Sequence, residues 1–139
     1  MTAPSPPPLV LIVDDSDKNR KLAREVLRAA GFRTLEAARG DEAIAVAATR
    51  LPDVILLDLR LPDMDGTDVA RKLRGRSETG SIPIVALSAS PIAGGGERLL
   101  ATGFDGYLQK PIDVRAFPQQ VRSHCDHRAS TRRETGQAR

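Results

Sequence analysis

The chain has 139 residues, a formal net charge of +3, a single cysteine and four aromatic side chains. This length suffices for one domain with its own core, and one cysteine excludes both a disulfide framework and a two-cysteine metal or redox motif. No segment reaches the roughly 18 consecutive apolar residues of a membrane-spanning helix. We therefore expect a soluble, cytoplasmic protein without a membrane partner.

The positive charge is concentrated at the C-terminus. Residues 122–139 contain five arginines and two acidic residues, whereas residues 1–121 contain 16 basic and 16 acidic residues. A neutral body with few aromatic residues lacks both the basic surface and the base-stacking platform of nucleic-acid-binding proteins. We expect no nucleic-acid partner, and we interpret residues 125–139 as a basic flexible tail.

The first structured unit is predicted to follow a proline-rich leader, residues 1–8, which has little to bury and should be disordered. Leu9–Val13 is an unbroken apolar run of the length and composition of a strand covered on both faces. Asp14 and Asp15 end the run. Ser16 or Asp17 can then cap a helix, which Gly31 is suited to end in a left-handed conformation.

The same strand-then-helix pattern recurs along the chain and predicts an α/β fold, a doubly wound parallel sheet of five strands with helices on both faces. Pro118 is suited to the first position of a last helix, where its missing N–H costs nothing, and Asp113 to Phe117 should form a preceding turn. The remaining predicted strands are Arg33–Ala37, Asp53–Asp58, Ile82–Ser88 and Gly106–Gln109, and the intervening helices are Asp41–Arg50, one ending near Arg74 and a short one ending near Gly103.

Polar residues stand at the carboxyl ends of four predicted strands, where ligands bind in such folds. They are Asp14 and Asp15, Asp58, Ser88 and Lys110. Three carboxylates at one edge would repel one another unless a cation lay between them, and hard oxygen ligands suit Mg²⁺. A carboxylate can attack phosphorus, so Asp58 is the candidate phosphoacceptor, with Lys110 and Ser88 contacting phosphoryl oxygens.

In these residues the chain resembles the receiver domains of two-component response regulators, from Leu9 to His124. The motifs are Asp14-Asp15 after a strand, Asp58 followed by Leu-Pro-Asp-Met-Asp-Gly at positions 61–66, Ser88-Ala89, and Tyr107 three residues before Lys110-Pro111. The resemblance implies a flavodoxin-like strand order 2-1-3-4-5 and a receiver domain over residues 9–124. It also implies a signalling phosphoacceptor that is not an enzyme.

The resemblance further implies the roles of individual residues. Asp15, Asp58 and the Arg60 backbone carbonyl would bind Mg²⁺ directly, and Asp14 through water. The phosphoryl donor would be a phosphohistidine on a sensor histidine kinase or a histidine phosphotransfer protein. A cis peptide would precede Pro111. On phosphorylation Ser88 would move toward the phosphate and Tyr107 would turn inward, and the downstream protein would bind the fourth helix, fifth strand and fifth helix.

Three other interpretations fit the sequence less well. Asp63 and Asp65 before Gly66 suggest a calcium loop, but the glutamate expected at its twelfth position is missing. A module that works without phosphorylation would not need the complete acidic set. A phosphatase with an aspartyl-phosphate intermediate would want a general acid two residues after Asp58, where this chain has Arg60.

Three features depart from the commonest pattern or limit the output. Arg60 and Ser90 stand at the positions that the resemblance links to water access, so we expect the lifetime of the aspartyl phosphate to depend on Arg60. Gly94–Gly96 stands at the start of a predicted helix, where each glycine costs about 1 kcal/mol relative to alanine, so we expect mobility there. Only 15 residues follow His124, so we expect a single-domain receiver, monomeric or a weak phosphorylation-dependent dimer.

Overall fold

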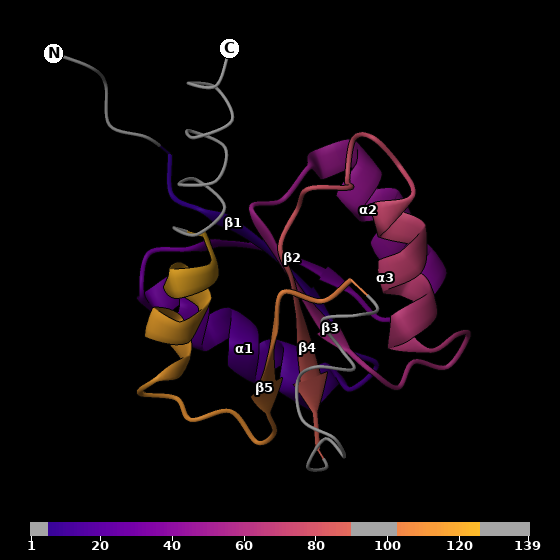
Figure 1. The fold of residues 1–139 in the computed structure, drawn as a ribbon. Helices are drawn as coiled ribbons and strands as arrows, with labels where there is room; N and C mark the ends of the chain where they lie inside the picture. Colours follow the sequence, from indigo (N-terminus) through magenta and orange to yellow (C-terminus); the bar gives the residue numbers. More distant parts are fainter. Residues whose placement is uncertain (1–5, 90–102, 126–139) are drawn as a thin grey trace, which may run out of the picture.

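The computed structural model describes residues 6–89 and 103–125, and a five-stranded parallel sheet runs through them (Figure 1). The order β2-β1-β3-β4-β5 confirms the predicted doubly wound, flavodoxin-like fold. Its strands are β1 (Leu9–Val13), β2 (Arg33–Ala37), β3 (Val54–Asp58), β4 (Ile84–Ser88) and β5 (Gly106–Gln109).

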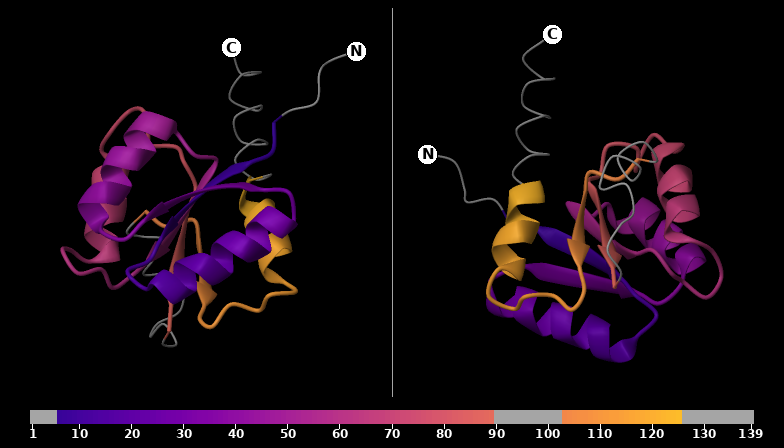
Figure 2. Two further views of the ribbon diagram at one scale, coloured as in Figure 1. Left: turned by 180° about the vertical axis from the view of Figure 1, so that it is seen from behind. Right: turned by 60° about the horizontal axis from the view of Figure 1, so that its bottom comes forward.

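Helices cover both faces of this sheet (Figure 2). One face packs against α1 (Asp17–Ala29) and the helical residues 117–125, around Leu27 and Phe117. The other packs against α2 (Gly40–Arg50) and α3 (Gly66–Arg74), around Ile44 and Leu73. Every residue of β1 and β3 is buried, because a strand with helices above and below has no solvent-facing side.

The first helix begins and ends as its sequence predicts. The Ser16 hydroxyl accepts a hydrogen bond from the amide of Asn19 at 3.2 Å and so caps α1. Beyond the helix, Gly31 has φ of 96°, a left-handed conformation that glycine adopts without the steric cost of a side chain. These two residues fix where α1 leaves β1 and where the chain turns back into β2.

Other predicted boundaries shift by one or two residues. β4 begins at Ile84 and not at Ile82, because the amide of Ile82 donates to the Thr79 carbonyl in a turn and Pro83 has no N–H to donate. β3 begins at Val54 and α2 at Gly40, each one residue from the predicted bound.

The last helix begins at Phe117, so Pro118 lies in its first turn and not at its first position. The Asp113 carboxylate accepts from the amides of Arg115 and Ala116, which forms the predicted preceding turn.

Some predictions concern residues at the margins of the described ranges. Pro7 and Pro8 of the predicted leader offer carbonyl oxygens to the Arg33 side chain and amide, each at 2.9 Å. Cys125, the first residue of the predicted tail, is helical. The Gly94–Gly96 triplet, Ser90, the short helix before Gly103 and residues 126–139 lie outside the described residues, so the domain limits stay predictions.

Candidate functional site

Three acidic side chains meet at the carboxyl edge of the sheet. Asp14 and Asp15 follow β1, and Asp58 ends β3, the strand that pairs with β1. One carboxylate oxygen from each lies within 4.8 Å of the other two. Asp14 and Asp58 are only 1% and 8% exposed, whereas Asp15 is exposed. The structure thus brings together the three carboxylates that the strand ends predicted.

Each polar group of Asp14 has a hydrogen-bond or ion-pair partner. Its amide donates to the Ala37 carbonyl of β2 at 3.1 Å, and its own carbonyl accepts from the Arg20 guanidinium at 2.7 Å. Its carboxylate accepts from the amide of Ser16 at 2.9 Å and pairs with the Lys110 ammonium at 2.7 Å. A buried carboxylate needs such partners, because burial without them would disfavour its charged form.

Asp58 is held by the loop that follows it. Its Oδ1 accepts from the amide of Arg60 at 3.0 Å, and the amide of Gly66 donates to the Leu59 carbonyl at 2.9 Å. The close return of the chain requires glycine at position 66, since a Cβ there would lie 2.7 Å from the Asp58 carbonyl oxygen. The loop therefore keeps the Arg60 backbone beside the Asp58 carboxylate, while the Arg60 side chain is exposed.

Lys110 reaches this edge from the residue after β5. The peptide between Lys110 and Pro111 is cis, as the resemblance implied. The Lys110 ammonium lies 2.7 Å from Asp14 Oδ2 and 3.0 Å from Asp58 Oδ2. Burial lowers the pKa of Lys110, but hydrogen bonds and charge from Asp14 and Asp58 outweigh it, so that the pKa is raised overall. Lys110 therefore stays protonated between two carboxylates.

Ser88 and Tyr107 lie on the two strands beyond β3. Ser88 is the last residue of β4 and is half-buried, and its carbonyl accepts from the amide of Lys110 at 2.7 Å. Tyr107 lies on β5 at the edge of the sheet and is 46% exposed. Ser88 is thus tied through the backbone to the lysine of the site, whereas Tyr107 is exposed to solvent.

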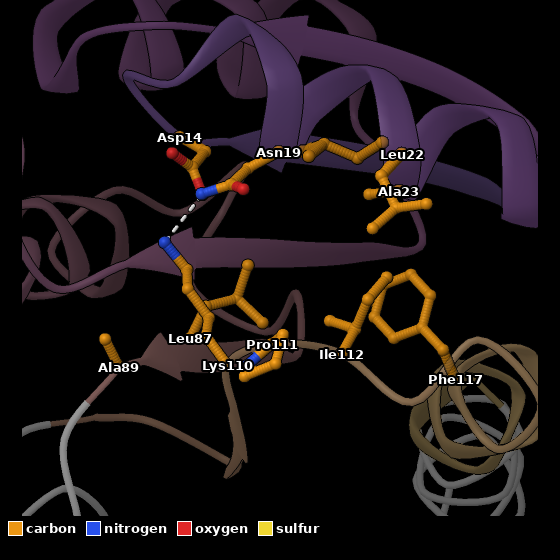
Figure 3. Close-up of a pocket in the computed structure, with 11 residues that line it drawn as sticks. Asp14, Asn19, Leu22, Ala23, Leu87, Ala89, Lys110, Pro111, Ile112 and Phe117 are labelled. Carbon is orange, nitrogen blue, oxygen red and sulfur yellow. Dashed lines mark ion pairs between the residues drawn. The ribbon is translucent and has the colours of Figure 1, made fainter.

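A cavity of about 380 Å³ opens beside the Lys110 side chain. Figure 3 shows the lysine reaching toward Asp14 past this cavity, with Leu22 of α1 on one side and Ile112 on the other. Phe117, fully buried, closes one end. The walls are mainly apolar, so the aliphatic part of the Lys110 side chain packs beside nonpolar groups. Its ammonium group pairs with the carboxylates of Asp14 and Asp58.

Sequence reasoning missed two residues that support the site. Arg20 of α1 contacts the Asp14 backbone, and Asp63 accepts from the amides of Gly40 and Asp41 at 2.7 and 3.0 Å, which caps α2. Those two hydrogen bonds, the one from Gly40 first, lower the pKa of Asp63. The N-cap residue Arg39 makes no side-chain capping hydrogen bond to the first amides of the helix, and Asp63 from another loop accepts from them instead.

The acidic cluster fits a divalent cation in its chemistry. Three carboxylates face one ammonium, which leaves an excess of two negative charges among these four groups. Carboxylate oxygens are the ligands that Mg²⁺ prefers, usually one or two of them together with water. Asp15 is the exposed member of the cluster, so its carboxylate is open to the solvent from which an ion would enter.

Comparisons with known proteins agree with this geometry. The response regulator receiver domain family matches residues 10–122. The polar-differentiation response regulator DivK of Brucella anthropi is 36% identical over 118 residues, which cover 85% of this chain and 96% of that protein.

Solved structures lead to the same family. The chemotaxis response regulator CheY4 of Vibrio cholerae is 30% identical with a TM-score of 0.80, over 85% of this chain and 98% of that one. The receiver domain of the Francisella response regulator 1452 is 28% identical with a TM-score of 0.79, over 86% and 98%. In the residues that the structure describes, no helix is long and apolar enough to cross a membrane. The chain belongs to the response regulator receiver domain family of two-component signalling.

Proposed function

We propose that Asp58 accepts a phosphoryl group from a phosphohistidine on a sensor histidine kinase or a histidine phosphotransfer protein. An Asp58 carboxylate oxygen bonds to phosphorus as the phosphorus–nitrogen bond of the donor breaks and the imidazole leaves. One observation carries the proposal. In a chain of this family, the carboxylate of Asp58 lies 3.0 Å from Lys110 and within 4.8 Å of carboxylate oxygens from Asp14 and Asp15.

Different residues of this chain would bind the metal and contact the phosphoryl group. Asp15, Asp58 and the Arg60 carbonyl would hold Mg²⁺, and Asp14 would do so through water. When bound, the ion supplies charge neutralisation for the phosphoryl oxygens. Lys110, already beside Asp58, can transfer its contact from a carboxylate oxygen to a phosphoryl oxygen with little movement. Ser88 offers a hydroxyl from the end of the neighbouring strand.

The output is a change in partner binding and not turnover of a substrate. Ser88 would move toward the phosphate, and Tyr107, which is 46% exposed, would turn inward. Tyr107 lies on β5, in the proposed binding surface of fourth helix, fifth strand and fifth helix, of which the fourth helix lies outside the described residues. The lifetime of the aspartyl phosphate depends on the exposed Arg60 side chain at the mouth of the site.

The test is to incubate the full chain with a small phosphodonor, such as acetyl phosphate, and Mg²⁺, and to weigh the intact protein. We expect a mass gain of one phosphoryl group that disappears in Asp58→Asn and when the metal is chelated. Asp53→Asn is a matched control, because Asp53 lies at the opposite end of β3 and binds the amide of Leu9. A mass gain that persists in Asp58→Asn would refute Asp58 as the phosphoacceptor.

A further inference from the structure

Arg20, in the first turns of α1, lies against the loop that carries Asp14 and Asp15. Its side chain is only 15% exposed, although arginine usually reaches the solvent. Its Nη1 donates to the Asp14 carbonyl oxygen at 2.7 Å, and its Nε donates to Glu36 Oε1 at 3.3 Å. Its Nη2 pairs with Asp17. The guanidinium thus connects one backbone oxygen with two carboxylates.

Glu36 of β2 fixes the orientation of this guanidinium. Its second oxygen, Oε2, accepts from Arg24 at 2.7 Å, so the carboxylate lies between two arginines that are one helical turn apart on α1. A planar guanidinium that is held at several of its donors has little freedom to rotate. Arg20 therefore presents Nη1 to the Asp14 carbonyl in a fixed direction.

The carbonyl that Arg20 holds belongs to the peptide linking the two aspartates. The Asp14 carbonyl and the Asp15 amide lie in one plane, so fixing the oxygen also fixes where the Asp15 backbone begins. The preceding peptide is held as well, by the bond from the Asp14 amide to Ala37. Without such restraints, repulsion between the carboxylates would favour moving exposed Asp15 away from the cluster.

We propose that Arg20 is a positioning residue of the acidic site: it holds the peptide between Asp14 and Asp15 so that both carboxylates stay with Asp58 around one divalent cation. This inference rests on the proposed function, because it concerns the Mg²⁺ of that site. Arg20 acts through the loop backbone, and in this role its own charge is incidental.

The sign of the effect on metal affinity distinguishes positioning from simple charge. As a positive charge near the site, Arg20 would repel Mg²⁺, so its removal would tighten binding. As a positioning residue, its removal frees the loop and weakens binding. Arg20→Lys keeps the charge but cannot reach three acceptors with one ammonium, whereas Arg20→Gln removes both the charge and the guanidinium fork.

The experiment is a titration of the full chain with Mg²⁺ alone, followed by calorimetry, for the wild type, Arg20→Lys, Arg20→Gln and Arg28→Gln. We expect Kd for Mg²⁺ to rise about tenfold in both Arg20 variants, as is typical when a supporting partner of a metal ligand is lost. Arg28→Gln is the matched control, since Arg28 lies on the same helix and donates to Thr34 of β2 without touching Asp14 or Glu36. It should bind Mg²⁺ like the wild type.

The outcomes separate this inference from the proposed function. A wild type that binds no Mg²⁺ would overturn the metal site and the inference with it. A wild type that binds, together with an Arg20→Lys variant that binds equally well or more tightly, would overturn the inference alone. Thermal unfolding checks that each variant is folded, and if Arg20→Gln is not, Arg20→Lys decides. Faster amide exchange at Asp15 in Arg20→Lys is the independent sign of a freed loop.

Discussion

Charged residues are paired differently at the two ends of the strands, called here the amino edge and the carboxyl edge of the sheet. At the amino edge, Asp53 accepts from the amide of Leu9 at 2.8 Å and Asp105 accepts from the amide of Ile84 at 2.8 Å. Arg74 pairs with Asp105 at 2.5 Å, so that charge is matched by charge. At the carboxyl edge, three carboxylates face the single ammonium of Lys110.

The difference indicates that charged residues at the amino edge stabilise the fold, whereas those at the carboxyl edge serve the proposed function. Matched charges and satisfied backbone groups at the amino edge fasten strands together, which is the usual task of partly buried polar groups. The excess of carboxylates at the carboxyl edge should cost stability, and the proposed function gives the reason for it, since these groups would bind Mg²⁺. Substitutions at the two edges should therefore have opposite consequences for folding.

Arg74 gives the largest expected effect, at the amino edge. Its guanidinium, 24% exposed, donates to the carbonyls of Gly80, Ile82 and Gly103 at 3.1, 2.6 and 2.9 Å, in addition to Asp105. Arg74→Leu keeps the apolar stem but leaves these partly buried acceptors without their donor. We expect the free energy of unfolding, measured with urea, to fall by about 3 kcal/mol.

The control for this prediction lies one helical turn earlier. Arg71 pairs with Asp68 at 3.1 Å, but the two side chains are 70% and 45% exposed. Such surface ion pairs contribute about 0.5 kcal/mol or less. Arg71→Leu should therefore unfold close to the wild type, and an equal loss in both variants would show that the backbone contacts of Arg74 are not what stabilises the amino edge.

Asp15→Asn should have a smaller effect and the opposite sign. Without divalent cations, removing one of three clustered carboxylates relieves repulsion, and we expect stability to rise by about 1 kcal/mol. At a Mg²⁺ concentration of about 100 times Kd, the wild type should gain about 2.7 kcal/mol from binding while the variant gains much less, so the ranking reverses.

Urea unfolding with and without Mg²⁺ measures both parts of this prediction. Asp68→Asn is the control, since Asp68 lies on α3 outside the acidic cluster and should leave the response to Mg²⁺ unchanged. If Asp15→Asn were as responsive to Mg²⁺ as the wild type, Asp15 would not be a ligand, and the contrast between the two edges would be weaker than proposed.

The sequence was most informative where burial alone determines structure. The apolar runs Leu9–Val13 of β1 and Val54–Leu57 of β3 have their predicted character because a strand covered on both sides buries the side chains of both its faces. The site could be predicted for a related reason. Parallel strands carry their carboxyl ends to one edge, so Asp14, Asp58 and Lys110 had to converge once the fold was known.

The supporting residues were not predictable, because their partners are backbone groups brought close only by the fold. Arg20 binds a carbonyl six residues away, and Arg74 binds one 29 residues away, yet both resemble ordinary helix arginines in the sequence. For Tyr107, the resemblance implied an inward turn on phosphorylation, and the structure describes a residue 46% exposed. Its role as a switch residue stays a prediction.

Asp63 shows the same limit and leads to the smallest expected effect. In the sequence it suggested a calcium loop, but in the fold its carboxylate caps α2 through the amides of Gly40 and Asp41, 23 and 22 residues away. An acid at a helix N-terminus is favoured in its charged form by those N–H groups and by the helix dipole. It thereby links α2 to the loop that holds Arg60.

The lowered pKa of Asp63 sets the direction of its pH dependence. A carboxyl whose pKa is lower in the folded than in the unfolded state contributes stability above its ordinary value of 3.8, and the contribution is lost as the pH falls through the folded value. Asp63→Asn should therefore be less stable than the wild type at neutral pH, and the difference should shrink below pH 3.8. Urea unfolding across this pH range measures the difference in stability.

Asp65→Asn is the control. It removes a carboxylate of the same loop that makes no helix-capping bond, so at neutral pH it should match the wild type. If the Asp63→Asn deficit persisted undiminished in acid, the carboxylate charge would not be what holds the loop to α2, and this part of the carboxyl edge would depend on packing around Met64 and Gly40 instead.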